Sequence, residues 1–253
     1  MTGFQLHQPE YVLLPVPHIS EFSIASTKQD LLIRNCTWAL TSFFRVFPLL
    51  PYNIIKKALK MVARAIIMSP NDNEFLGYAF FIFSFTTEHY KGIAKELFEL
   101  DIIKNVIQCL DIDVLNIQLS CLRIIGNIAS GNANQTQLLI DLNVLDYLKK
   151  TILNKTKTIR KETAWIISNI AAGTQKQIET LIKENFLPIL EQLIENDDYE
   201  IRRECIWGVC NFTSVENPEY MKKILEQNIL KIIHDCLKSE SAKYLAVSLE
   251  AFC

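Results

Sequence analysis

The residues of this chain whose types and spacing point to chemistry are two tryptophans with the same polar companions. Trp165 and Trp207 lie 42 positions apart, and each has an asparagine four positions later and a glutamate three positions earlier. Spacings of three and four place side chains on one stripe of a helix. The two predicted stripes consist of Glu162, Trp165 and Asn169, and of Glu204, Trp207 and Asn211.

Such stripes suit the binding of an extended basic peptide. An asparagine amide both donates and accepts hydrogen bonds, so it can hold a peptide backbone whatever its side chains are. Indole rings one repeat apart form slots for the aliphatic parts of Lys or Arg, with a cation–π attraction of roughly 0.5 to 2 kcal/mol each. The glutamates then meet the charged ends of those side chains. A tryptophan at helical spacing can also be a core residue, and for Trp38, which Ser42 follows where an asparagine is expected, the core and groove interpretations both stay open.

The helices that carry these stripes belong to a repeat of about 42 residues. Only 7 glycines and 8 prolines occur, and the apolar residues between 28 and 252 recur mostly at i, i+3, i+4 and i+7, which predicts helices. A helical repeat of this length is typical of armadillo or HEAT stacking. We therefore predict an all-α armadillo-repeat solenoid, a right-handed superhelix. Four similar segments begin at Asp101, Asn143, Asn185 and Asn228, in steps of 42, 42 and 43, and a second set lies around Arg123, Trp165 and Trp207, with Phe80 and Trp38 at the preceding steps.

Each period is expected to contain three helices, for example 175–184, 187–195 and 199–211, with 71–73, Gly131, Gly173 and 196–198 in turns. Residues 1–28 contain three prolines and are predicted to be an extended arm or cap. Residues 29–253 are predicted to form the solenoid, with about four full repeats and partial end repeats. The last predicted helix, 242–253, ends where a polar cap is expected, so a partner that covers a solenoid end is one alternative.

Composition excludes several classes of function. Lys plus Arg at 26 against Asp plus Glu at 28 give a formal charge of −2, without the basic excess of a nucleic-acid-binding protein. Seven scattered cysteines indicate a reducing compartment, and four separated histidines offer no metal-ligand spacing. No phosphate loop, nucleophile elbow or membrane-spanning stretch is present. We expect no enzyme, metal, cofactor, nucleic-acid partner or membrane partner.

Some residues have plain structural interpretations. The basic pairs Arg160–Lys161 and Arg202–Arg203 are expected to be exposed helix starts. Cys205 and Cys210, which flank Trp207, are expected to pack against neighbouring helices because no histidine lies near either in sequence. The run 80–83, which is apolar on every side, suits a helix that is buried all round or that faces a partner.

Residues 29–253 resemble the C-terminal armadillo repeats of the importin-α (karyopherin-α) family. The resemblance rests on LLIRNCTWAL (31–40), IIGNIASGNANQTQ (124–137), IRKETAWIISNIAAG (159–173) and IRRECIWGVCNFTS (201–214). It implies an adaptor that binds nuclear localisation signals for nuclear import, in cytoplasm and nucleus, through a major groove on early repeats and a minor groove on later ones. The minor-groove pattern of that family corresponds here to Arg123, Asn127, Thr136, Glu162, Trp165, Ser168, Asn169, Glu204, Trp207 and Asn211.

The chain also departs from that family pattern. Ser42 stands where the asparagine after Trp38 is expected, and Phe80 and Ser84 replace the next tryptophan and its polar partner. The earlier repeats and the basic importin-β-binding segment are not found, so direct importin-β binding is not expected. Two hypotheses follow: a module that binds basic peptide or protein cargo through a minor-type groove, or a non-catalytic scaffold subunit of a larger assembly.

Overall fold

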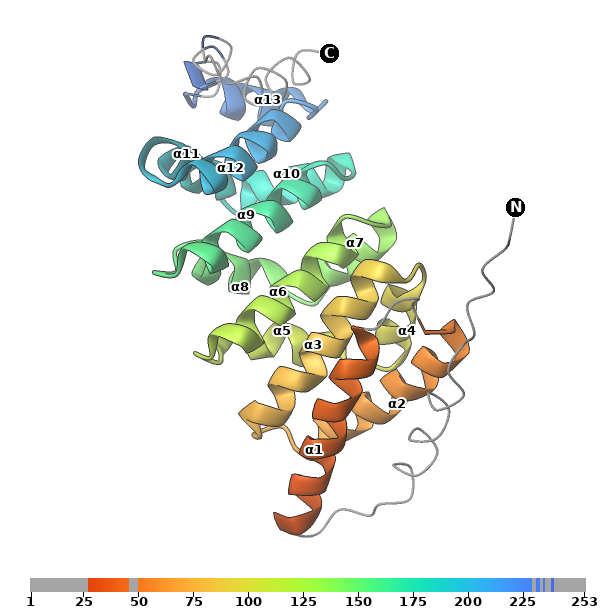
Figure 1. The fold of residues 1–253 in the computed structure, drawn as a ribbon. Helices are drawn as coiled ribbons and strands as arrows, with labels where there is room; N and C mark the ends of the chain where they lie inside the picture. The colour runs from red at the N-terminus through yellow and green to blue at the C-terminus, as the bar shows by residue number, and fades with distance from the viewer. Residues whose placement is uncertain (1–26, 46–49, 229–230, 233, 235–237, 239–253) are drawn as a thin grey trace, which may run out of the picture. The chain divides into compact units, whose positions relative to one another are not determined.

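The computed structural model describes residues 27–45, 50–228, 231, 232, 234 and 238. The segment 1–26, most of the predicted arm, and the predicted last helix at 242–253 lie outside the described residues. Every regular element within the described part of the chain is a helix (Figure 1). The chain divides into an N-terminal unit, residues 1–102, and a C-terminal unit, residues 103–253.

The N-terminal unit is organised around one apolar helix, α3. Helices α1, α2 and α4 all pack against α3, and Phe75, Phe80 and Phe83 of α3 are fully buried. Asp72 caps α3 by accepting a hydrogen bond from the backbone N–H of Phe75 at 3.0 Å. The predicted helix at 80–83 is present, and three of its four residues are buried, but Phe81 is partly exposed, so the helix is not buried all round. The bounds of the four helices are α1 Thr27–Phe44, α2 Tyr52–Met68, α3 Asn73–His89 and α4 Ile93–Glu99.

The C-terminal unit repeats a pattern of two shorter helices followed by one longer helix. Its long helices α6, α9 and α12 pack in that order, α6 on α9 and α9 on α12 (Figure 1). The three helices expected between 175 and 211 are confirmed to within one residue at each end. The bounds are α5 Ile103–Gln108, η3 Cys109–Asp111, α6 Leu115–Ala129, α7 Ala133–Asp141, α8 Val144–Thr151, α9 Lys157–Ala171, α10 Gln175–Lys183, α11 Phe186–Asn196, α12 Tyr199–Phe212 and α13 Pro218–Leu225.

A left-handed residue marks the start of the second helix in three consecutive periods. Asp101, Asn143 and Asn185 have φ angles of 53°, 60° and 57° and lie just before α5, α8 and α11. Asn and Asp adopt this conformation more readily than other residues with a side chain. The turn therefore explains why three of the four similar segments found in the sequence begin with Asp or Asn.

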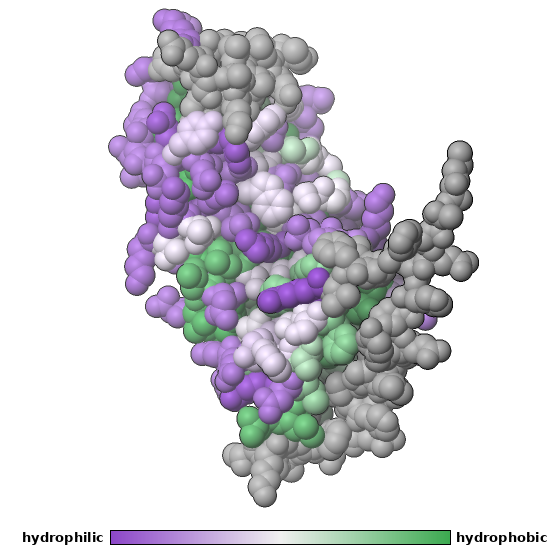
Figure 2. Space-filling model, viewed as in Figure 1, coloured by the Kyte–Doolittle hydropathy of each residue, from purple (hydrophilic) through white to green (hydrophobic). Residues whose placement is uncertain are grey.

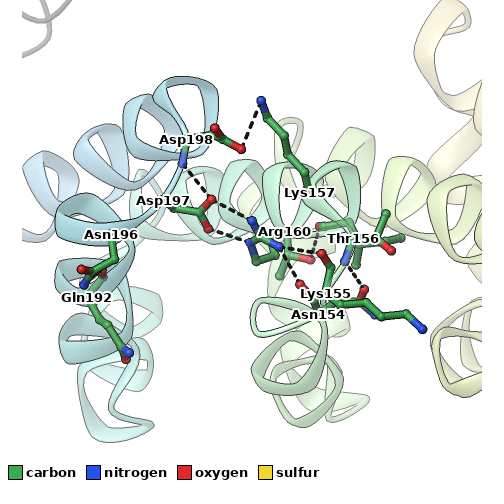
Figure 3. A network of polar contacts seen from close by, with 11 residues as sticks. Asn154, Lys155, Thr156, Lys157, Arg160, Gln192, Asn196, Asp197 and Asp198 are labelled. Atoms are coloured by element: carbon green, nitrogen blue, oxygen red, sulfur yellow. Dashed lines mark hydrogen bonds and ion pairs between the residues drawn. The ribbon is translucent and has the colours of Figure 1, made fainter.

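An arginine on the long helix of one period is bound by a carboxylate of the next. Arg160 donates from Nε and Nη2 to the two carboxylate oxygens of Asp197, at 2.6 and 2.7 Å, and from Nη1 to the carbonyl oxygens of Asn154 and Lys155 (Figure 3). The hydrogen bonds from Arg160 hold the pKa of Asp197 below its ordinary value. Only 18% of the Arg160 side chain is exposed, so the expectation of an exposed helix-start residue was wrong at this position.

Candidate functional site

Three neighbouring helices bring together nine of the predicted site residues. Because α6 packs on α9 and α9 on α12, side chains at equivalent positions of these helices form adjacent rows. On the face shown in Figure 2, hydrophilic side chains predominate over α9 to α12. The residues are Arg123 and Asn127 on α6, Glu162, Trp165, Ser168 and Asn169 on α9, and Glu204, Trp207 and Asn211 on α12.

The indole of Trp165 lies directly on the backbone of α6. A Cβ added to Gly126 would lie 2.0 Å from a ring atom of Trp165, well inside van der Waals contact. Any larger residue at 126 must therefore displace the ring, and Gly126 is a positioning residue that sequence reasoning missed. The sequence does contain a signal for this position: a small residue stands 39 positions before Trp165 and before Trp207, namely Gly126 and Ser168.

The two asparagines of the site differ in their hydrogen bonds. Asn211 Nδ2 on α12 donates to the carbonyl oxygen of Ser168 on α9 at 2.9 Å, and Ser168 Oγ donates to the carbonyl oxygen of Trp165 at 2.9 Å. By contrast, Asn169 Nδ2 is buried and has no acceptor among the described residues. A buried donor without an acceptor costs about 1 to 3 kcal/mol. We therefore expect a ligand or a water to supply the missing acceptor.

Both glutamates of the site face an arginine of the chain. Glu162 Oε1 lies 3.5 Å from Arg123 Nε, and Glu204 Oε1 accepts from Arg203 at 2.7 Å from Nη2 and 3.3 Å from Nε. Glu204 is only 8% exposed. The Arg203 side chain is 31% exposed and pairs with the site, so it is more than the exposed helix start that was expected. Each carboxylate is thus partly neutralised before any ligand arrives.

Two of the predicted residues lie apart from these rows. Thr136 is on α7, is 2% exposed, and donates from Oγ1 to the carbonyl oxygens of Ala129 and Asn132 at 3.3 and 3.2 Å. It therefore fixes the turn between α6 and α7. Trp38 belongs to α1 in the N-terminal unit and is 57% exposed, which excludes the core interpretation for this residue.

On α3, the residue equivalent to Trp165 and Trp207 is Phe81. Phe80, which the 42- to 43-residue step indicated, is fully buried, whereas Phe81 is partly exposed. Ser84 Oγ donates to the carbonyl oxygen of Phe81 at 2.9 Å, the bond that Ser168 makes to Trp165. The expectation for Phe80 was wrong by one residue because the step of the repeat varies by one.

The cysteines of the site region are packed thiols. Cys205 and Cys210 are 0% and 4% exposed, which confirms the packing interpretation. Burial raises the pKa of the Cys205 thiol far above its ordinary value and that of Cys109 to about 11, so the nucleophilic thiolate form is disfavoured. The described residues contain no group of three or more His, Cys, Asp or Glu that could hold a metal ion. None of the described helices combines the length and apolar character needed to cross a bilayer.

Parts of this sequence are similar to known proteins. The armadillo/beta-catenin-like repeat family matches residues 174–214, which span α10 to α12. Importin subunit alpha-3 of Arabidopsis thaliana is 30% identical over 150 residues, which cover 59% of this chain and 28% of that protein. Over that part of its length, this chain is similar to importin-α subunits. Importin subunit alpha-1b of Oryza sativa subsp. japonica is similarly 30% identical over 135 residues, covering 53% and 25% of the two chains.

The importin-α-like chain also has the fold of solved armadillo structures. A designed armadillo repeat protein in complex with a (KR)4 peptide superposes with a TM-score of 0.78 at 23% sequence identity, covering 94% of this chain and 98% of that chain. The predicted armadillo solenoid is thereby confirmed. The importin-α-like protein spans between a quarter and a third of the length of the two curated relatives named above.

Proposed function

We propose that this importin-α-like protein binds an extended basic peptide of the nuclear-localisation-signal type, in nuclear import, through a minor-type groove on the C-terminal unit. The groove consists of the α9–α12 stripe, defined as Glu162, Trp165, Asn169, Glu204, Trp207 and Asn211, with Arg123, Asn127 and Ser168 beside it. The single observation that carries the proposal is the buried, unpaired Asn169 Nδ2 next to an indole fixed on Gly126. Further support comes from the similarity to importin-α subunits and from the (KR)4 peptide that the designed armadillo protein binds.

Each group of the stripe has a distinct task. Asn169 and Asn211 hold the peptide backbone, with a peptide carbonyl as the acceptor that Asn169 Nδ2 lacks. Trp165 and Trp207 lie on consecutive packed helices, and a Lys or Arg stem inserts between their rings. Glu162 and Glu204 attract the charged ends. Thr136 supports the turn after α6, and Trp38 of the N-terminal unit stays a separate predicted contact for a basic side chain.

The experiment titrates a fluorescent Lys/Arg-rich peptide against the wild-type chain and against the double variant Trp165→Ala, Trp207→Ala, at about 150 mM salt. We expect micromolar binding by the wild type and at least about 30-fold weaker binding by the double variant, since each of the two cation–π contacts is worth about 1 to 2 kcal/mol when desolvated. A Glu-rich peptide of equal length is the control ligand. No binding by the folded wild type would reject the peptide-binding proposal.

The alternative is a scaffold subunit whose partner covers part of the solenoid. The observation that favours it is the exposed apolar surface of α1, where Leu31 and Trp38 are 53% and 57% exposed. A scaffold subunit would co-purify with one stable partner and show no affinity for basic peptides, whereas the proposed adaptor binds cargo reversibly and is present in cytoplasm and nucleus.

A further inference from the structure

Helix α2 has a row of basic side chains on its solvent-facing side. Lys57, Lys60 and Arg64 are exposed and are spaced by three and four positions, so they lie on one stripe of the helix. The opposite side of α2 belongs to the core of the N-terminal unit, where Leu59 and Ile66 are 0% and 1% exposed. Because α2 contains no Asp or Glu, its exposed side carries charge of one sign.

These three cations lack a counter-charge within the described part of the chain, where none of them forms an ion pair. Other exposed lysines have one: Lys56 binds Glu96 at 2.6 Å, and Lys150 of α8 binds Asp111 at 2.9 Å. The bond from Lys56 holds the pKa of Glu96 below its ordinary value, and Lys60 adds only a longer-range attraction. Like charges three or four positions apart destabilise a helix, so the stability of the fold does not account for this row.

Exposure distinguishes the α2 cations from Arg202 of α12, which also lacks an ion pair. The Nε of Arg202 is buried and has no acceptor among the described residues, so this residue is not the exposed helix start that was expected from the sequence. The α2 cations, by contrast, are open to a partner that approaches from solution.

The basic row ends beside two exposed apolar side chains. Ile67 and Met68 follow Arg64 by three and four positions and are 60% and 54% exposed. Single exposed apolar residues are common on protein surfaces, but an adjacent pair that extends a charged row forms a surface of mixed chemistry. Met and Arg are enriched at protein interfaces. The α2 stripe, defined as Lys57, Lys60, Arg64, Ile67 and Met68, therefore suits contact with another protein.

The charge of the α2 stripe selects the class of partner. Lys57 and Arg64 are seven positions apart, which is about 10 Å along the helix. An extended peptide places alternate side chains about 7 Å apart on one side, so its carboxylates can reach all three cations. We propose that the α2 stripe binds an acidic peptide segment of another protein, with an apolar residue after the acidic run in contact with Ile67 and Met68.

Two other anionic partners fit the stripe less well. A basic amphipathic helix enters a bilayer with its apolar side, but that side of α2 is buried in the N-terminal unit. Nucleic-acid-binding proteins have a basic excess, whereas this chain has a formal charge of −2 and the stripe would neutralise few phosphates. The acidic peptide is therefore the preferred ligand.

The α2 stripe is independent of the proposed basic-peptide groove. It belongs to the N-terminal unit, shares no residue with the α9–α12 stripe and attracts ligands of the opposite charge. In the titration of the basic peptide, the Glu-rich control ligand is therefore expected to bind to the α2 stripe and not to the groove. The double variant Trp165→Ala, Trp207→Ala should leave this binding unchanged, so failure of one site does not imply failure of the other.

A titration of the full chain with a fluorescent peptide, in which a run of glutamates precedes leucine, tests the proposal at about 50 mM salt. The triple variant Lys57→Gln, Lys60→Gln, Arg64→Gln should bind at least about ten-fold more weakly than the wild type, as expected for the loss of three exposed ion pairs. Because like charges are removed, this variant should unfold thermally at the same or a higher temperature, which shows that it is folded. No binding of the peptide by the folded wild type would overturn the proposal.

A second triple variant controls for net charge. It removes three exposed cations of the C-terminal unit that form no ion pair with another described residue: Lys104→Gln, Lys155→Gln and Lys176→Gln. This variant should bind the acidic peptide within about two-fold of the wild type, because charges far from the stripe are screened. Equal losses of affinity in the two triple variants would show non-specific attraction and contradict a site on α2.

Two further comparisons test the apolar contact and the class of partner. The variant Ile67→Ser, Met68→Ser should weaken binding of the leucine-containing peptide about three-fold and leave a peptide with serine in place of leucine unaffected. An equal response of both peptides would overturn the apolar contact. Vesicles of phosphatidylcholine with phosphatidylserine are the competing ligand: if the stripe binds the vesicles and not the acidic peptide, its partner is a membrane and the proposal is wrong.

Discussion

The two units carry the same kind of helix face with different side chains. In the α9–α12 stripe, each tryptophan has a glutamate three positions before it and an asparagine four positions after it. The corresponding surface of the N-terminal unit keeps an aromatic residue but has neither the glutamate three positions before it nor the asparagine four positions after it. This α1–α3 stripe consists of Asn35, Trp38 and Ser42 on α1, and Tyr78, Phe81 and Phe85 on α3.

Two structural contacts outside the proposed ligand-binding groups are retained in both units. A hydroxyl three positions after the aromatic residue donates to its carbonyl oxygen: Thr41 to Trp38 at 2.7 Å and Ser168 to Trp165 at 2.9 Å. An arginine–aspartate contact also occurs in both: Asp197 binds Arg160 in the C-terminal unit, and Asp72 accepts from Nε and Nη2 of Arg34 at 3.2 and 2.8 Å in the N-terminal unit. The fold is thus maintained independently of the ligand-binding groups, which can be lost while the scaffold stays intact.

The α1–α3 stripe has its own chemistry. The rings of Phe81 and Phe85 lie 6.4 Å apart, that of His89 stacks on Phe85 at 4.2 Å, and the guanidinium of Arg45 lies 4.4 Å from the centre of the Phe81 ring. The slot beside Phe81 is therefore already occupied by a cation of the chain. This surface is poorly suited to a second basic side chain, and the comparison predicts that basic peptides depend mainly on the C-terminal unit.

The largest effect is expected from the arginine–aspartate contact. Arg160→Gln should lower the free energy of unfolding by about 3 kcal/mol, because Asp197 is then left largely buried without its charge partner. Arg34→Gln should cost less, since the Arg34 side chain is 31% exposed. Urea unfolding in a Trp38→Phe background, where the remaining tryptophans report on the C-terminal unit, measures the first loss. Equal losses for the two variants would contradict the burial argument.

Acid provides an independent check on that contact. Because the bonds from Arg160 lower the folded-state pKa of Asp197, the ionised carboxylate stabilises the folded chain above its unfolded pKa of about 3.9. This contribution is lost as the pH falls through the lowered value. The difference in stability between wild type and Arg160→Gln should therefore shrink below about pH 4, and a constant difference would argue against the ion pair.

The next largest effect on stability is expected to differ between two glycines of the long helices, Gly126 and Gly208. Gly126→Ala should destabilise the chain by about 2 kcal/mol, because its Cβ must displace the ring of Trp165. Gly208→Ala is the matched control: its nearest contact is the flexible end of Leu190 at 3.0 Å, and alanine favours a helix by about 1 kcal/mol. Thermal unfolding and Trp165 fluorescence measure both. A tolerated Gly126→Ala with unchanged fluorescence would show that the ring is not held by α6.

A smaller effect distinguishes binding from stability. Asn169→Ala should weaken basic-peptide binding about ten-fold, as for one lost hydrogen bond to the backbone, yet leave the free energy of unfolding unchanged or slightly higher, because an unpaired buried donor is removed. Ser42→Ala, at the corresponding position of the α1–α3 stripe, should change neither quantity. Peptide titration and urea unfolding of both variants test this; a loss of stability in Asn169→Ala would mean that its amide is satisfied in the folded chain.

The regular parts of the molecule could be predicted from the sequence because they depend on local patterns. Helix α10 ends at Lys183, within one residue of its expected end, and Asp101, Asn143 and Asn185, which begin three of the repeated segments, occupy left-handed turns. The composition of the α9–α12 stripe followed from helical spacing in the same way, and the structure places its six members on two packed helices.

The contacts that local patterns do not determine were missed. The partner of Arg160 lies 37 positions away, so only packing of the next period shows that this arginine is largely buried. Gly126 matters because of a ring from another helix. Within the apolar run of α3, one residue of drift in the repeat exchanged Phe80 for Phe81, since both are phenylalanine and the sequence offers nothing to separate them.

The smallest effect concerns the arginine that already occupies the acidic side of the groove. Arg203 competes with a basic peptide for Glu204, so Arg203→Gln should raise the affinity about three-fold and make binding more sensitive to salt, as expected for a partly exposed ion pair worth at most about 1 kcal/mol. Lys222→Gln, which removes the same charge from a largely exposed residue of α13, is the matched control. If both variants change the affinity equally, net charge is responsible; if Arg203→Gln weakens binding, Arg203 instead holds Glu204 in place for the ligand.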